Sequence, residues 1–172
     1  TGRIESDRQL AAHIETVERL VEKHPSDPGL RFTAIKLYEW RAYLPRYSHR
    51  HQKEALEQSV RHVERAIHAR PLWGRAWAAW LDLGARIDNA WRPELEYRLN
   101  TALTVGRHDL HTQQYLVPFA LREWNALPAE VKPRRREFLR YVHDKGGRSK
   151  SQIDIYLRQA PDHPLAKAFE TT

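Results

Sequence analysis

The sequence predicts an all-α protein, an α-solenoid of antiparallel helical hairpins with about seven to eight helices. Composition is the first observation: 41% of the 172 residues are hydrophobic, only 7 are Gly, and the β-branched alternation of an all-β chain is missing. Recurrence is the second. An amphipathic segment, a Pro and another amphipathic segment occur around Pro25 and again around Pro71, with a weaker copy near Arg107. Because such repeats bury their apolar faces only against neighbours, the recurrence predicts stacked hairpins.

Individual helices follow from the spacing of apolar residues and from the residues that begin or end helices. Ser6 and Asp7 are good N-caps for the first helix, and Pro25 and Pro28 end it. The expected helices cover residues 7–24, 29–43, 52–69, 72–87, 93–105, 109–124, 128–143 and 149–159. Residues 46–52 are expected to form an inserted polar loop. We therefore expect one helical repeat domain over residues 1–160 and a loosely ordered tail over 161–172, which contains two Pro residues.

The recurrent segments resemble the tetratricopeptide repeat (TPR), a helix-turn-helix unit of 34 residues. When Pro71 is aligned with the conserved Pro of that repeat, Trp77 and Trp80 fall at its bulky positions. Two residues depart from the pattern: Leu81 occupies a small position and Gly84 an aromatic one. The resemblance implies a degenerate, TPR-like version of the fold.

A narrower likeness covers residues 29–160. The segments RPLWGRAWAAWL (70–81), PELEYRLNTAL (93–103) and LREWNALP (121–128) resemble the VpsP family of bacterial polysaccharide-biosynthesis proteins. Members are short repeat proteins encoded with exopolysaccharide or O-antigen machinery, usually with a membrane segment before a periplasmic repeat domain. The resemblance implies an accessory, non-catalytic protein of the cell envelope, periplasmic and membrane-anchored in its full-length form. A cytoplasmic location stays open, because a chain without Cys suits either compartment.

In TPR proteins the first helix of each hairpin lines a concave groove, and the resemblance carries this surface onto nine candidate residues: Lys36, Glu39, Trp40, Arg75, Asp82, Arg86, His111, Gln114 and Arg122. We expect a polar and mostly basic groove that suits an acidic or carboxyl-terminal peptide, because Arg binds carboxylates through two parallel hydrogen bonds. Charge reversal at Arg75 and Arg86 should then abolish partner capture without changing thermal unfolding. The alternatives are an ordinary Arg-rich helix surface and a contact site in the 46–52 loop.

Six Trp residues raise the possibility of sugar stacking. Trp77 and Trp80 lie three positions apart on one helical face, which indicates the core. Trp40, Trp73 and Trp91 are the better ligand candidates, because each is expected at a helix end or in a turn. The second function hypothesis is therefore direct binding of an anionic polysaccharide by a basic, Trp-bearing groove.

Other function classes find little support. The net charge of +7 permits nucleic acid, but the one dense cluster, residues 132–136, contains Pro133 and reads as the start of a helix, so nucleic acid is an unlikely partner. The ten His residues lack metal-site spacing, and no nucleophile or phosphate-binding motif is present. No apolar run is long enough to cross a membrane, so membrane contact is expected only through a segment outside this chain. The expected function is non-catalytic binding of protein partners in polysaccharide assembly, with no cofactor and no metal.

Overall fold

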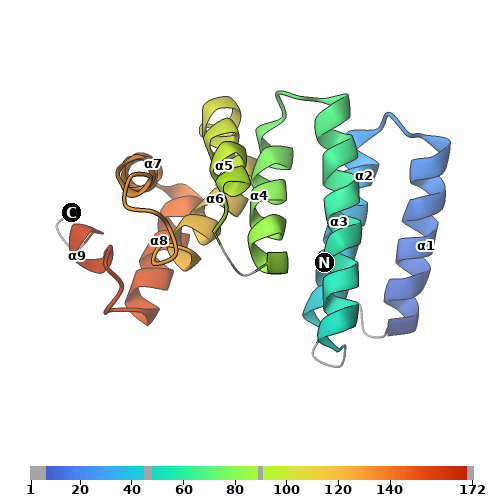
Figure 1. Cartoon of the computed structure of the whole chain (residues 1–172), viewed down its shortest axis with the longest axis horizontal. Coiled ribbons are helices and arrows are strands. Elements are labelled where there is room, and N and C mark those ends of the chain that lie inside the picture. The colour runs from blue at the N-terminus through green and yellow to red at the C-terminus, as the bar shows by residue number, and fades with distance from the viewer. Residues whose placement is uncertain (1–6, 45–47, 89–90, 170–172) are drawn as a thin grey trace.

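The computed structural model describes residues 7–44, 48–88 and 91–169, and these residues are all-α, as predicted. They form nine helices without a strand (Figure 1). The helices are α1 (Asp7–Lys23), α2 (Pro28–Tyr43), α3 (His49–Ala69), α4 (Gly74–Asp88), α5 (Pro93–Gly106), α6 (Leu110–Arg122), α7 (Lys132–Lys145), α8 (Gly147–Gln159) and α9 (Ala166–Phe169). In the described ranges, none of these helices is long and apolar enough to cross a membrane.

Several helices begin where polar side chains cap them. Asp27 Oδ1 accepts hydrogen bonds from the backbone N–H of Gly29, at 2.8 Å, and of Leu30, at 3.3 Å, immediately before Pro28 opens α2. Asp109 Oδ2 caps α6 in the same way, accepting from the N–H of Thr112 at 2.8 Å. These caps satisfy backbone donors that have no partner inside the helix.

Three predicted boundaries were wrong. Ser48 caps α3, so residues 49–52 form its first turn and the expected 46–52 loop is shorter; residues 45–47 lie outside the described part. The helix expected from residue 128 begins at Lys132 after a stretch of turns. The last long helix, α8, begins at Gly147 instead of residue 149, directly after α7. Ser6, one of the two expected N-caps of the first helix, lies outside the described residues.

Consecutive helices from α1 to α8 pack against each other, and so do two pairs of alternate helices. Figure 1 shows α1 to α4 side by side, with the chain reversing direction from each to the next. Contacts also join α4 to α6 and α6 to α8. Ser149 Oγ donates to Gln113 Oε1 at 3.0 Å, and Tyr156 Oη donates to the Leu121 carbonyl at 3.4 Å. Because these pairs advance together along both helices, α6 and α8 run parallel.

Residues of α1 pack on α2 in a separate apolar cluster of Leu10, Ile14 and Leu37, while the main apolar core extends from α2 to Leu165. Its fully buried members include Ile35, Leu81, Leu95, Leu116, Phe119, Leu139, Ile153 and Leu165. Trp77 is 8% exposed, and its indole N–H donates to the Pro71 carbonyl at 2.7 Å. Trp80 packs on the same core while remaining half-buried. Both Trp residues therefore pack in the core, as their spacing predicts.

The TPR pattern has an aromatic residue at position 84, where this chain has Gly. The side chain of Arg98 of α5 occupies the space that a side chain at position 84 would fill. The Arg98 guanidinium lies 3.7 Å from the centre of the Trp80 ring, and Nη1 donates to the Trp80 carbonyl at 3.2 Å. A Cβ atom on Gly84 would lie 2.5 Å from that Nη1. The guanidinium of the following helix thus takes the place of an aromatic side chain.

A second close approach joins the start of α4 to the end of α5. A Cβ on Gly106 would lie 2.8 Å from Gly74 Cα and 2.7 Å from Thr112 Oγ1. Both distances are shorter than van der Waals contact, so the two backbones touch only because neither residue has a side chain.

The described part of the tail, residues 161–169, is more firmly packed than expected. Leu165 is fully buried, Ala166 is 5% exposed, and both belong to the segment predicted to be loosely ordered. Phe169 packs on the core, with its ring centre 5.1 Å from that of His143. Two exposed Pro residues, Pro161 and Pro164, precede the last helix, and the apolar side chains that follow them hold the segment in place.

Candidate functional site

The candidate groove residues lie on α2, α4 and α6, and five of them form one network of charges. Lys36 and Glu39 belong to α2, Asp82 and Arg86 to α4, and Arg122 to α6. The two carboxylates are buried: Glu39 is 4% exposed and Asp82 is 2% exposed. Buried carboxylates are stable only when cations or hydrogen-bond donors surround them.

Asp82 is held by two guanidinium groups from two helices. Arg86, one turn further along α4, pairs with Asp82 Oδ2, and Arg122 Nη2 lies 2.8 Å from Asp82 Oδ1. Arg122 also pairs through Nε with Glu123 Oε1 at 2.6 Å. Burial lowers the pKa of Arg122, but attraction to Asp82 and the hydrogen bonds outweigh burial, so that the pKa is raised. The pairs therefore join α4 to α6.

Glu39 connects α2 to the same network. Lys36 Nζ lies 2.6 Å from Glu39 Oε2, one turn earlier on α2. Arg86 Nη1 lies 3.9 Å from Glu39 Oε1, which is an ionic contact but too long for a hydrogen bond. Arg86 thus lies between Glu39 and Asp82 and contacts both.

These pairs correct the expectation of a mostly basic groove. Lys36, Arg86 and Arg122 face three carboxylates within the structure itself, which balances their formal charges. Their cations stabilise buried acids rather than stand ready for a partner's carboxylate. Charge reversal of Arg86 would place a third acid beside Glu39 and Asp82, so we now expect this variant to lower the melting temperature rather than leave it unchanged.

Arg75 differs from the other cationic candidates. Its guanidinium lies 4.0 Å from the centre of the Phe32 ring, and no carboxylate among the described residues pairs with it. Tyr115 of α6 lies nearby, since its ring centre is 6.2 Å from that of Phe32 and 4.2 Å from Lys36 Nζ. Burial, followed by the charge of Glu39, raises the pKa of the Tyr115 phenol well above its usual range. Arg75 is thus the Arg candidate most available to an anionic group.

A cleft of about 520 Å³ opens at one end of the groove. Its lining comes from α2, α3, α4 and α6 and from the residue after α6: Ala42, Tyr43, Gln52, Leu56, Ala85, Arg86, Arg122 and Glu123. Ala42, Ala85 and Leu56 provide apolar surface, whereas Arg86, Arg122 and Glu123 are polar and charged. Tyr43 is 60% exposed, and the guanidinium of Arg86 lies 5.1 Å from its ring centre.

The remaining candidates do not join the network. Trp40 is 51% exposed on α2, while His111 is exposed and Gln114 is half-buried on α6. None of the three forms a hydrogen bond or ion pair with the charged residues in the described part of the chain. Tyr43, Tyr115 and Glu123 were missed. Each lies within three residues of a candidate, and a small change of helical register would have included them.

The structure also changes the roles expected for two Trp residues. The Trp73 ring centre lies 4.9 Å from that of Phe32, and Trp91 packs on the core with its ring centre 6.4 Å from that of Phe119. Of the three Trp residues expected to be available for sugar stacking, only Trp40 is largely exposed.

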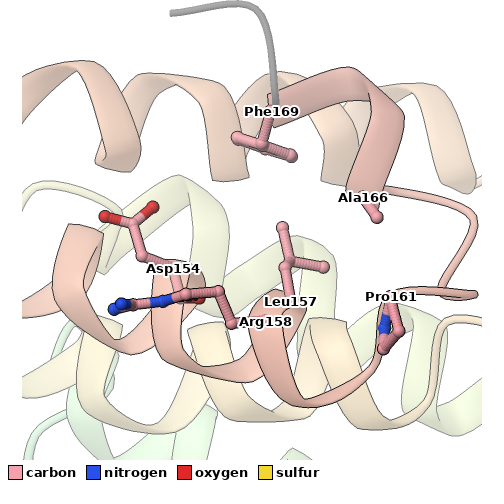
Figure 2. A pocket seen from close by; sticks show the side chains of 6 residues that line it. All are labelled: Asp154, Leu157, Arg158, Pro161, Ala166 and Phe169. Atoms are coloured by element: carbon pink, nitrogen blue, oxygen red, sulfur yellow. Dashed lines mark hydrogen bonds between the residues drawn. The ribbon is translucent and has the colours of Figure 1, made fainter.

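Another cleft, of about 620 Å³, lies between α8 and α9 at the other end of the molecule. Figure 2 shows Leu157, Ala166 and Phe169 bordering it, with Asp154 at one side. The Asp154 carboxylate already lies 3.0 Å from His143 Nε2 and 3.5 Å from Lys150 Nζ. This cleft has both apolar and charged lining residues, and it contains none of the groove candidates.

Comparison with known proteins gives this chain no relative: no family model, no curated protein and no solved structure matches it. In the described ranges, no group of three or more His, Asp or Glu residues is arranged to hold a metal ion. The candidate site is therefore defined by its own geometry. It consists of ion-paired residues on three helices, a cleft with apolar and charged lining at one end, and Arg75 toward the other end.

Proposed function

We propose that this protein is a non-catalytic scaffold that binds a protein partner, and that its helices form a TPR-like solenoid. The packing of consecutive helices from α1 to α8, and of α4 with α6 and α6 with α8, supports the solenoid. The cellular setting of the proposal comes from the sequence resemblance: an accessory component of bacterial envelope or exopolysaccharide biosynthesis or export, located in the periplasm.

The cleft at the end of the groove is the observation that carries the proposal. Ala42, Ala85 and Leu56 offer an apolar surface, and Tyr43 adds a largely exposed ring at its border. This arrangement suits a peptide segment that inserts one apolar or aromatic side chain and hydrogen-bonds along its backbone. Aromatic residues often act as anchors in such interfaces.

The ion pairs contribute by fixing the walls of the cleft before a partner arrives. Arg86 and Arg122 are both held by Asp82, so their side chains lose little further freedom on binding. Since the ordering of long side chains opposes association, a cleft with ordered walls binds more tightly than one with mobile walls. In this proposal Arg86 and Arg122 favour binding by keeping the walls of the cleft ordered, and not by attracting a charged partner.

The proposal is tested by affinity capture with cross-linking and mass spectrometry on envelope and cytosolic fractions of the source cell. Tyr43→Ser removes the exposed ring from the cleft. Tyr97→Ser is the matched control, because Tyr97 is 62% exposed on α5 and its ring also touches one neighbour, Trp77. We expect partner proteins to be captured by the wild type and the control and lost with Tyr43→Ser, with cross-links that map to α2, α3 and α4. Equal capture by the two variants would refute the cleft assignment.

A further inference from the structure

A third cleft, of about 240 Å³, lies between α5 and α7, helices that do not line the groove. It is bordered by Leu103, Arg107, Arg134, Glu137, Phe138 and Tyr141. Its volume falls below the range of about 300 to 1,000 Å³ typical of pockets for drug-sized ligands, which suits a single small polar unit.

The cations of this cleft lack the internal partners that those of the groove possess. Arg107 and Lys145 pair with no carboxylate in the described ranges, and Arg134 donates only to the amide oxygen of Asn100, at 3.0 Å. The Arg107 guanidinium and Lys145 Nζ lie 6.0 and 5.8 Å from the centre of the Tyr141 ring. Arg107, which lines the cleft, and Lys145, which does not, therefore both lie close to the Tyr141 ring, and Arg134 borders the same cleft. These positive charges favour an anionic ligand.

The hydrogen bonds of His108 determine whether the Tyr141 hydroxyl can donate a hydrogen bond to a ligand. Arg107 Nε lies 3.0 Å from His108 Nε2, and His108 Nδ1 lies 2.6 Å from the Tyr141 hydroxyl oxygen. A guanidinium can only donate, so Nε2 accepts and Nδ1 carries the proton that is donated to Tyr141. Since the Tyr141 oxygen accepts this bond, its own O–H is left to donate, and an oxygen of a ligand in the cleft is a suitable acceptor.

The cleft also contains features that a simple oxyanion would not use. Glu137 lies on its border and forms no ion pair or hydrogen bond among the described residues, so that its carboxylate can accept hydroxyl groups. Leu103 and Phe138 supply apolar surface. A ligand that matches every group carries an anionic oxygen for the Arg side chains and Tyr141, hydroxyls for Glu137 and a C–H face for the apolar wall.

We propose that the cleft between α5 and α7 binds an acidic sugar unit, a hexuronate residue of an anionic glycan. Its carboxylate contacts Arg107, Arg134 and the Tyr141 hydroxyl, its ring hydroxyls donate to Glu137, and its C–H face rests on Leu103 and Phe138. This site is separate from the groove, so a protein partner and a glycan can be bound at the same time.

The test is a titration of the whole chain with glucuronate, followed by amide chemical shifts in NMR spectra, with glucose and inorganic phosphate as comparison ligands. We expect glucuronate to shift amides of α5 and α7 and to bind roughly tenfold more tightly than glucose, because the charge-assisted hydrogen bonds are lost with a neutral sugar. Arg107→Gln and Arg134→Gln should each weaken binding by about tenfold, and Tyr141→Phe by several-fold. Arg140→Gln is the control, since Arg140 is an exposed α7 residue that does not line the cleft.

Glu137→Gln distinguishes a sugar from a simple anion. A sugar hydroxyl loses its charged acceptor, so glucuronate binding should weaken, whereas phosphate binding should tighten as a repulsive charge is removed. Glucuronate binding that tightens in this variant, or phosphate that binds as tightly as glucuronate, would overturn the sugar assignment. Binding that is absent, or unchanged in the Arg107 and Arg134 variants, would overturn the site itself. None of these outcomes bears on Tyr43, so the two proposals fail separately.

Discussion

Asp82→Asn should destabilise the protein more than any other isosteric change in the groove. Asp82 is 2% exposed and holds Arg86 and Arg122 by its two oxygens. The Asn side chain has nearly the same shape, but its amide group can accept from only one guanidinium and directs an NH2 toward the other. The variant therefore removes the buried charge while it leaves the packing of α4 almost unchanged.

The expected loss can be worked out from the exposure of the two Arg side chains. A buried hydrogen bond to a charged group contributes about 1.5–3 kcal/mol, and breaking a fully buried pair costs about 3–5 kcal/mol. The side chains of Arg86 and Arg122 are 22% and 39% exposed, so water can partly solvate both after the charge is lost. We expect a decrease in the free energy of unfolding of about 2–3 kcal/mol. For a chain of this size, that corresponds to a melting temperature lower by roughly 4–12 °C.

Urea unfolding followed by circular dichroism and Trp fluorescence measures this change. Asp162→Asn is the control, because Asp162 is exposed and forms no ion pair among the described residues. Its free energy of unfolding should remain within about 0.5 kcal/mol of the wild type. An Asp82→Asn protein as stable as the control would show that the network does not hold α4 and α6 together.

Two further predictions concern packing and pH. Gly106→Ala should cost about 1–3 kcal/mol in urea unfolding, because its Cβ would lie 2.8 Å from Gly74 Cα, and a variant as stable as the wild type would contradict this close approach. Burial, followed by the hydrogen bond to Glu18, raises the pKa of Tyr38 from 10.0 to about 12. Since the folded state retains the phenol proton longer, this contribution to stability is complete below pH 10 and is lost as the pH rises toward 12. Urea unfolding at several pH values should show a shallower decline in this window for Tyr38→Phe, and an unchanged slope would exclude the role of Tyr38.

The positions of the helices could be predicted well because local signals determine them. Pro93 opens α5 as predicted, and α2 begins at Pro28, one residue before the expected start. The start of α3 was missed because residues 49–52 carry no apolar periodicity. The Ser48 cap was the available signal, since its Oγ accepts from the His51 N–H at 3.4 Å.

The ion pairs of the groove could not be predicted from the sequence. Repeat positions indicated that Glu39, Asp82 and Arg86 would share one face, and the structure brings them together. The same positions did not indicate that these residues would pair with one another, because pairing depends on burial and on the offset between α2, α4 and α6. A list of residue types on a face cannot separate a cation that binds a partner from one that neutralises a buried acid.

The cleft between α5 and α7 was not predicted for a related reason. Arg107 and Tyr141 are far apart in the sequence, and the third copy of the repeat is too degenerate to fix their register. The cluster at residues 132–136 was expected only to start a helix. It does so, but its members differ: Arg134 borders the cleft, whereas Arg135 is 1% exposed and burial lowers its pKa to about 10.

The contact of Arg98 with Gly84 and Trp80 has a consequence for engineering. Consensus repeats are often treated as interchangeable units, because each carries the side chains that its neighbour needs. Here Arg98 of α5 fills the space over the Trp80 ring of α4, so the side chains of these two helices fit each other and would not fit a consensus neighbour. A consensus helix grafted in place of α5 would leave that space empty. A consensus aromatic residue at Gly84 would in turn exclude Arg98, so this hairpin can be transplanted only as a whole.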